Sequence, residues 1–242
     1  MPEQAGAAGE YRKAAQEARR LLRPFHGDIT DVLRGLVRIN TVAVPPEGNE
    51  APAQKYLAKE LKRRRMDVEL YDTGFIAKSG HRYVRRERKY AGRPNLVARV
   101  AGKGGGRSLL FSGHIDTVPP GPGKWKYGPW EGRMRGGKLY GRGAWDMKGG
   151  LAAQFGALIA LKNAGIQLSG DVIAESVVDE EWAGGGGTLA ARLKGISADA
   201  CVITEGTGLA VVRATRGGCF LEITARAGDP AAYFSKEEVV GP

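Results

Sequence analysis

The chain has few cysteines and histidines, with two of the first and three of the second among 242 residues. Two cysteines do not make a disulfide framework, and their positions do not suggest a cysteine-rich zinc site. Cys201 and Cys219 each lie in an apolar, strand-like run, so we expect both to be buried free thiols. No cluster of acidic residues accompanies His26 or His81 at a spacing that would bring them together. His114 is therefore the candidate histidine ligand.

The sequence also contains no apolar run long enough to span a membrane, and no apolar signal-peptide core follows its polar first residues. We therefore expect a cytoplasmic protein without a membrane partner. Neither a Gly-x-Ser-x-Gly nucleophile elbow nor a Walker phosphate loop is present. The sequence thus gives no support to a serine hydrolase of the α/β-hydrolase type or to a P-loop nucleotide hydrolase.

Acidic residues are in deficit, because 37 lysines and arginines outnumber 26 aspartates and glutamates and give a formal net charge of +11. Much of the excess lies in the runs 62–65 and 82–89. Such runs bind nucleic acid, steer acidic substrates or form solvated faces. The first run ends a predicted helix, where cations suit the helix dipole, and no nucleic-acid-binding module is present. We expect solvated faces and no nucleic-acid partner; a steep loss of affinity with salt would reveal the opposite.

Apolar, strand-like runs alternate with stretches of helical periodicity along the chain. Strands are predicted at 68–71, 95–100, 109–112, 138–140, 172–178, 199–204, 209–213 and 219–225, and helices at 9–24, 32–37, 50–65, 147–165 and 188–193. This alternation predicts an α/β fold with a mostly parallel sheet flanked by helices. Asp28, Thr30 and Asp31 are predicted helix caps, and the basic segment 73–93 is predicted to be a surface loop.

The stretch SGHIDTVP at residues 112–119 follows an apolar run that is typical of a buried strand. It places an imidazole and a carboxylate at the end of that strand, where open α/β sheets build their sites. His114 is a candidate metal ligand, and Asp116 is the candidate partner that orients its ring. Two simpler interpretations stay open, with His114 as a satisfied polar residue near the core and Asp116 as a turn-forming residue.

Acidic residues also follow later predicted elements, each in a turn with glycine nearby. Asp146 lies in GRGAWDMKGG (141–150), Glu180 and Glu181 lie in DEE (179–181), and Glu205 lies in ITEG (203–206). Oxygen donors at such places are candidate metal ligands, and one glutamate of the adjacent pair is a candidate general base. Each also has a simpler interpretation: a helix N-cap for Asp146, an exposed turn for the acidic triplet and a solvated loop for Glu205.

In this order, SGHIDTVP, GRGAWDMKGG, DEE and ITEG resemble the motifs of the di-zinc exopeptidase and deacylase family. The family includes acetylornithine deacetylase, succinyl-diaminopimelate desuccinylase, aminoacylase and carboxypeptidase G. The resemblance covers roughly residues 28–227 and implies a zinc-exopeptidase-like catalytic domain. It also implies a metal-dependent amide hydrolase that acts on N-acyl amino acids or small peptides.

The resemblance implies a metal ligand set as well. His114 and Glu205 would bind one Zn²⁺, Glu181 would bind the other, and Asp146 would bridge the two. Co²⁺ or Mn²⁺ could replace Zn²⁺ with these ligands. A cis peptide would follow the bridging residue, between Asp146 and Met147.

Two further residues would be catalytic by the same resemblance. Asp116 would orient His114. Glu180 would be the general base, which takes a proton from the attacking water and delivers it to the leaving amine.

The sequence departs from the family in length and in histidine content. Members carry a lid and dimerisation domain after the ITEG segment, and a later histidine on the second zinc. We therefore expect a truncated chain, with an incomplete catalytic domain at 1–215 and the start of the lid at 216–242. A homodimer is expected only with a complete lid. The alternative to an active hydrolase is an inactive remnant that binds at most one metal.

Overall fold

The computed structural model of the chain describes residues 2–182 and 184–215. The chain divides into two units, Met1–Gly206 and Thr207–Pro242, and only residues 207–215 of the second are described. The predicted lid segment 216–242 therefore lies outside the described residues. The helices, strands and site described below all belong to the first unit.

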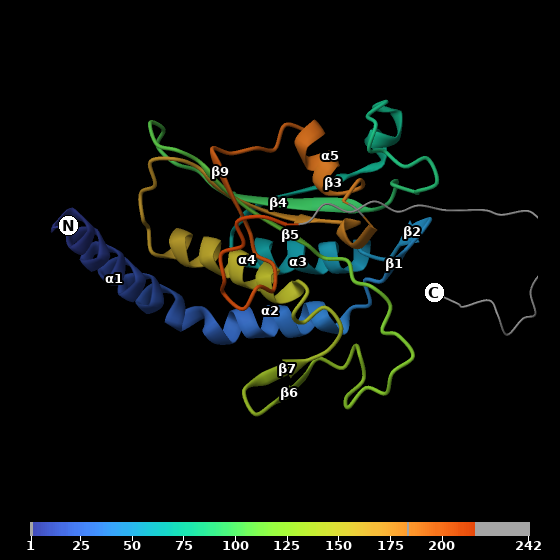
Figure 1. Cartoon of the computed structure of the whole chain (residues 1–242), viewed down its shortest axis with the longest axis horizontal. Helices are drawn as coiled ribbons and strands as arrows, with labels where there is room; N and C mark the ends of the chain where they lie inside the picture. The colour runs from blue at the N-terminus through green and yellow to red at the C-terminus, as the bar shows by residue number, and fades with distance from the viewer. Residues whose placement is uncertain (1, 183, 216–242) are drawn as a thin grey trace, which may run out of the picture. The chain divides into compact units, whose positions relative to one another are not determined.

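The first unit contains both helices and strands (Figure 1). The helices are α1 (Pro2–Leu22), α2 (His26–Arg38), α3 (Ala51–Arg63), α4 (Lys148–Asn163) and α5 (Thr188–Leu193), with 3-10 turns at Arg23–Phe25, Gly74–Lys78 and Glu180–Trp182. The strands are β1 (Ala43–Val44), β2 (Glu47–Gly48), β3 (Asp67–Asp72), β4 (Pro94–Val100), β5 (Leu109–His114), β6 (Arg133–Arg135), β7 (Lys138–Tyr140), β8 (Val172–Val177) and β9 (Ala200–Ile203).

The central sheet has the strand order β3-β4-β8-β5-β9. Strand β4 pairs antiparallel with both of its neighbours, and β5 pairs parallel with β8 and β9, so β4 alone runs against the other four. The predicted α/β fold with a mostly parallel sheet is confirmed. Because β5 and β8 are in register from Leu109↔Val172 to His114↔Val177, the two strands end side by side.

Helices cover both faces of this sheet, with α2, α3 and α4 on one face and α5 on the other (Figure 1). Helix α4 contributes Leu151, Phe155, Leu158 and Ile159 to the main core, and these residues share one face of the helix because of their spacing. Their partners on α2 and α3 include Leu36 and Leu57. The packing fixes the start of α4 close to the carboxyl end of β5.

Several local predictions differ from the structure. Helix α2 begins at His26, and the Thr30 hydroxyl donates to the His26 carbonyl at 2.7 Å inside the helix, so it does not cap the helix start. Residues 209–213 form no strand. Cys201 is exposed because β9 lies at the edge of the sheet, where β5 is its only partner among the described strands. The predictions for 219–225 and Cys219 lie outside the described residues.

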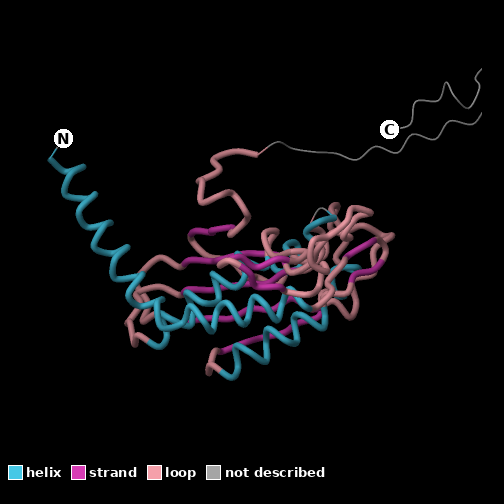
Figure 2. Tube along the Cα trace, turned by 90° about the horizontal axis from the view of Figure 1, so that it is seen from below, coloured by secondary structure: helices cyan, strands magenta, loops and turns pink. Residues whose placement is uncertain are grey.

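Helix α1 extends away from the sheet, and its described side chains are mostly exposed (Figure 2). Its composition explains this arrangement, since alanine, glutamate and arginine favour a helix but leave it without a wide apolar face. Among the helices that the structure describes, we find none with the length and apolar character needed to cross a bilayer.

Asn95 joins three parts of the fold through its buried amide. Its Nδ2 donates to the Tyr71 hydroxyl and to the Gly187 carbonyl, both at 2.9 Å, and its Oδ1 accepts the Val178 backbone N–H at 3.1 Å. We predict that Asn95→Leu lowers the free energy of unfolding by about 1–3 kcal/mol, because buried backbone groups then lose their partners. Urea unfolding of both proteins measures the difference, and an equal midpoint would contradict the prediction.

Candidate metal centre

His114 is the last residue of β5 and has a side chain only 1% exposed. Its Nδ1–H donates to the Asp116 backbone carbonyl at 3.0 Å, and a carboxylate oxygen of Asp116 lies 3.5 Å from the same nitrogen. These contacts fix the ring and point Nε2 away from the strand. An imidazole held in this way presents Nε2 as a ligand when the ring is neutral.

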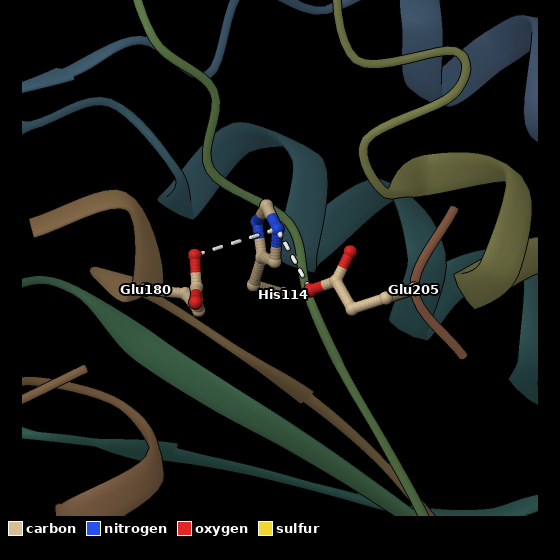
Figure 3. A group of neighbouring side chains, drawn as sticks. All are labelled: His114, Glu180 and Glu205. Atoms are coloured by element: carbon tan, nitrogen blue, oxygen red, sulfur yellow. Dashed lines mark ion pairs between the residues drawn. The ribbon is translucent and has the colours of Figure 1, made fainter. Parts of the chain in front are cut away.

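Carboxylates surround this Nε2 atom. Asp146 Oδ1 lies 2.9 Å away, Glu205 Oε1 lies 3.5 Å away and Glu180 Oε2 lies 3.7 Å away. Figure 3 shows Glu180 and Glu205 on opposite sides of the ring. Glu181 also belongs to the cluster, because one of its carboxylate oxygens lies within 4.8 Å of ligand atoms of His114 and Asp146.

The topology explains why residues so distant in sequence meet here. Strands β5, β8 and β9 run parallel, so their carboxyl ends and the turns that follow them share one edge of the sheet. Asp146 reaches this edge from the turn before α4. Gly150 permits the close approach, because a Cβ there would lie 2.0 Å from the Thr204 backbone oxygen, one residue before Glu205.

Lys148 holds the start of α4 in place and was missed as a site residue by sequence reasoning. Its buried Nζ donates to the Leu36 and Ile39 carbonyls, each at 3.0 Å, near the end of α2. Burial lowers the pKa of Lys148 to about 7. The peptide bond between Asp146 and Met147, just before α4, is cis, as the resemblance implied.

The electrostatics of the cluster are strongly negative. Burial alone lowers the pKa of His114, but its hydrogen bonds to Asp116 and Asp146 and the nearby charge of Glu180 raise that pKa to about 11. Burial raises the pKa of Glu180 and Glu205, and burial together with the charge of Asp146 raises the pKa of Glu181 to about 7. Burial is the main reason that these carboxyls resist ionisation, and the charges of the neighbouring carboxylates add to the effect.

This donor set fits a divalent cation. Two groups of three residues each place their ligand atoms within 4.8 Å of one another, His114 with Glu180 and Glu205, and His114 with Asp146 and Glu181. One imidazole nitrogen with several carboxylate oxygens suits Zn²⁺, and the field that raises the pKa of His114 also attracts a cation. The donors alone do not select one metal.

The structure thus brings together all six residues that the sequence singled out, and it adds a contact that the sequence did not predict. The Asp116 carboxylate accepts the backbone N–H groups of Glu180 and Glu181, each at 3.1 Å. Asp116 therefore contacts both the histidine ring and the turn that carries the acidic pair.

The segment 73–93, predicted to be a surface loop, supplies two buried arginines. The side chains of Arg88 and Arg93 are 1% and 5% exposed, and both contact Asp179, the residue before Glu180. Arg93 also pairs with the fully buried Glu50 at the start of α3. The prediction was wrong for these two residues because their acidic partners are distant in sequence. The only local signal was the position of Arg93 directly before a buried strand.

A model of one protein family, described as peptidase family M20/M25/M40, matches residues 110–240. This range contains all six site residues and more than half of the chain.

Curated relatives include two kinds of enzyme. The chain is 45% identical over 118 residues to succinyl-diaminopimelate desuccinylase of Gluconacetobacter diazotrophicus, a match that covers 47% of the chain and 30% of the relative. It is 35% identical over 164 residues to N-formyl-4-amino-5-aminomethyl-2-methylpyrimidine deformylase of Halalkalibacterium halodurans, which covers 66% of the chain and 34% of the relative. The chain thus spans about a third of the length of these relatives.

Solved structures with the same fold include human carnosine dipeptidase 1, with a TM-score of 0.62 at 21% identity over 78% of this chain and 40% of that one. The dipeptidase Dug1p of Saccharomyces cerevisiae has a TM-score of 0.56 at 16% identity over 70% of this chain and 35% of that one. At these identities the likeness concerns the fold alone.

Proposed function

The chain belongs to peptidase family M20/M25/M40, and from this premise we propose that it is a metal-dependent hydrolase of amide bonds in N-acyl amino acids or small peptides. The convergence of His114 with four carboxylates at one sheet edge is the observation that carries the proposal. Relatives named as a desuccinylase and a deformylase support the removal of an acyl group from nitrogen.

In this proposal, His114 and Glu205 would hold one cation, Glu181 would hold a second, and Asp146 would serve both. Zn²⁺ is the metal we propose, with Co²⁺ or Mn²⁺ as substitutes. Bound divalent cations would supply Lewis acidity, which polarises the scissile carbonyl and lowers the pKa of water.

Glu180 is the proposed general base. Its carboxylate takes a proton from the attacking water as the water oxygen bonds to the amide carbon. The same carboxylate then delivers the proton to the nitrogen as the carbon–nitrogen bond breaks. Asp116 positions both the base and the His114 ring, because it contacts the Glu180 backbone N–H and the ring nitrogen at once.

Metal removal tests the proposal. We expect the chain to bind Co²⁺ with visible absorption bands, to hydrolyse a member of a panel of N-acyl amino acids, and to lose that turnover with a chelator. Added Zn²⁺ or Co²⁺ should restore it, since affinity depends on ligands that remain in place. Isothermal titration gives the number of cations per chain.

Three outcomes separate the alternatives. Chelator-sensitive turnover with two cations per chain supports the proposal. One cation per chain without hydrolysis of any panel member supports an inactive metal-binding remnant. Absence of any cobalt binding contradicts a metal site at this edge of the sheet.

A further inference from the structure

Four buried charged side chains form an ionic network behind the acidic pair. Arg93 Nη2 donates to Asp179 Oδ1 at 2.9 Å and also pairs with Glu50, while Arg88 pairs with the same Asp179 carboxylate. The side chains of these residues are at most 5% exposed. Two arginines and two carboxylates balance one another in charge, which lets the network stay ionised out of water.

Asp179 connects this network to the metal centre through the backbone. It has a φ of +66°, a left-handed conformation that is uncommon outside glycine but that aspartate adopts more readily than most residues. Its carbonyl accepts the Gly184 N–H at 3.0 Å, so it also closes the turn that carries Glu180 and Glu181. The arginines therefore hold the Asp179 side chain two residues after β8 ends, at the start of the turn that carries the acidic pair.

The turn is held from two sides. Asp116 accepts the N–H groups of Glu180 and Glu181 on the metal side, and the arginines hold Asp179 on the other. A buried ion pair contributes little net stability by itself, so stability alone is a weak reason for this network. Its place directly before two candidate site residues suggests a different role.

We propose that Asp179, held by Arg88 and Arg93, is a positioning residue that sets the orientation of the Glu180–Glu181 turn toward the metal centre. The effect of this residue on metal affinity rests on the proposed function, because a displaced turn would move Glu181 away from the cation. The effect on the Glu180–Glu181 turn itself can be measured without metal.

The variant Asp179→Asn tests the inference, because it keeps the shape of the side chain and removes the charge that holds two guanidinium groups. We expect Co²⁺ affinity to fall about 10–100-fold, the range typical for residues that support metal ligands. We also expect faster hydrogen exchange at the Glu180 and Glu181 amides in the metal-free chain, measured by NMR, with β8 amides still protected.

Two further variants separate positioning from stability. Glu175→Gln removes another buried carboxylate of β8 that pairs with an arginine, here Arg192 at 2.6 Å, and should lower stability without changing Co²⁺ affinity. Adding Arg88→Met to Asp179→Asn restores the balance of buried charge. This double variant should regain unfolding stability relative to Asp179→Asn but not Co²⁺ affinity or amide protection.

The inference is overturned if the Glu180 and Glu181 amides of Asp179→Asn exchange as slowly as those of the unaltered chain. It is also overturned if the double variant regains both stability and Co²⁺ affinity, because the network is then only structural. Absence of Co²⁺ binding by the unaltered chain would reject the proposed function instead, and amide exchange would still decide the role of Asp179.

Discussion

Replacing Glu180 with glutamine is expected to lower kcat by about 10²–10⁴-fold while the chain keeps its metal, because general base catalysis contributes about this much and an amide cannot accept the proton. Burial raises the pKa of Glu180 above its ordinary value, which moves this carboxyl toward the range that suits a base near neutral pH. Steady-state kinetics with an N-acyl amino acid, together with cobalt absorption, measure both quantities.

The geometry leaves one other role for Glu180, and a matched variant distinguishes the two. Glu180 and Glu205 lie 3.7 and 3.5 Å from the same His114 nitrogen, and together with it they form one of the candidate ligand groups. Glu205→Gln should therefore weaken metal binding, because Glu205 is a proposed ligand. If Glu180→Gln loses as much metal affinity as Glu205→Gln, Glu180 is a ligand and the base must be sought elsewhere.

Those two glutamates also illustrate what the sequence could predict. Each follows an apolar run that forms a parallel strand, and the carboxyl ends of parallel strands share one edge of a sheet. Strand periodicity is local, so the ends of β5, β8 and β9 could be located within a few residues. That information was enough to expect that His114, the acidic pair and Glu205 would meet, whereas Asp146 lies in the turn before α4 and follows no strand of this sheet.

The parts that could not be predicted depend on contacts between distant residues. Nothing near Arg88 in the sequence indicates that its partner is Asp179, and the surrounding basic run is typical of a solvated loop. Thr30 is of a residue type that often caps helices, but the helix begins earlier and packs into the core through Val32 and Leu36. In both cases tertiary packing decides between structures that local chemistry allows equally.

Arg93→Met is expected to lower the free energy of unfolding at neutral pH by about 3–5 kcal/mol, the usual cost of breaking a buried ion pair from one side. Methionine fills much of the volume but leaves Glu50 and Asp179 without this partner in the core. Urea unfolding measures the loss. Arg99→Met is a matched control, because the pair of Arg99 with Asp171 is substantially exposed and should contribute at most about 1 kcal/mol.

The loss in Arg93→Met should also depend on pH in a definite direction. Burial raises the pKa of Glu50 above its ordinary value of 4.5, while the hydrogen bond and charge of Arg93 lower it, so removing Arg93 raises this pKa further. Above pH 4.5, Glu50 of the folded variant then keeps a proton that Glu50 of the unfolded chain has released. The free energy of unfolding of the variant therefore falls as the pH rises up to the folded pKa of Glu50. The difference from the unaltered chain should therefore be larger at pH 8 than at pH 5. A difference that grows as the pH falls would show that Glu50 is not the group left unpaired.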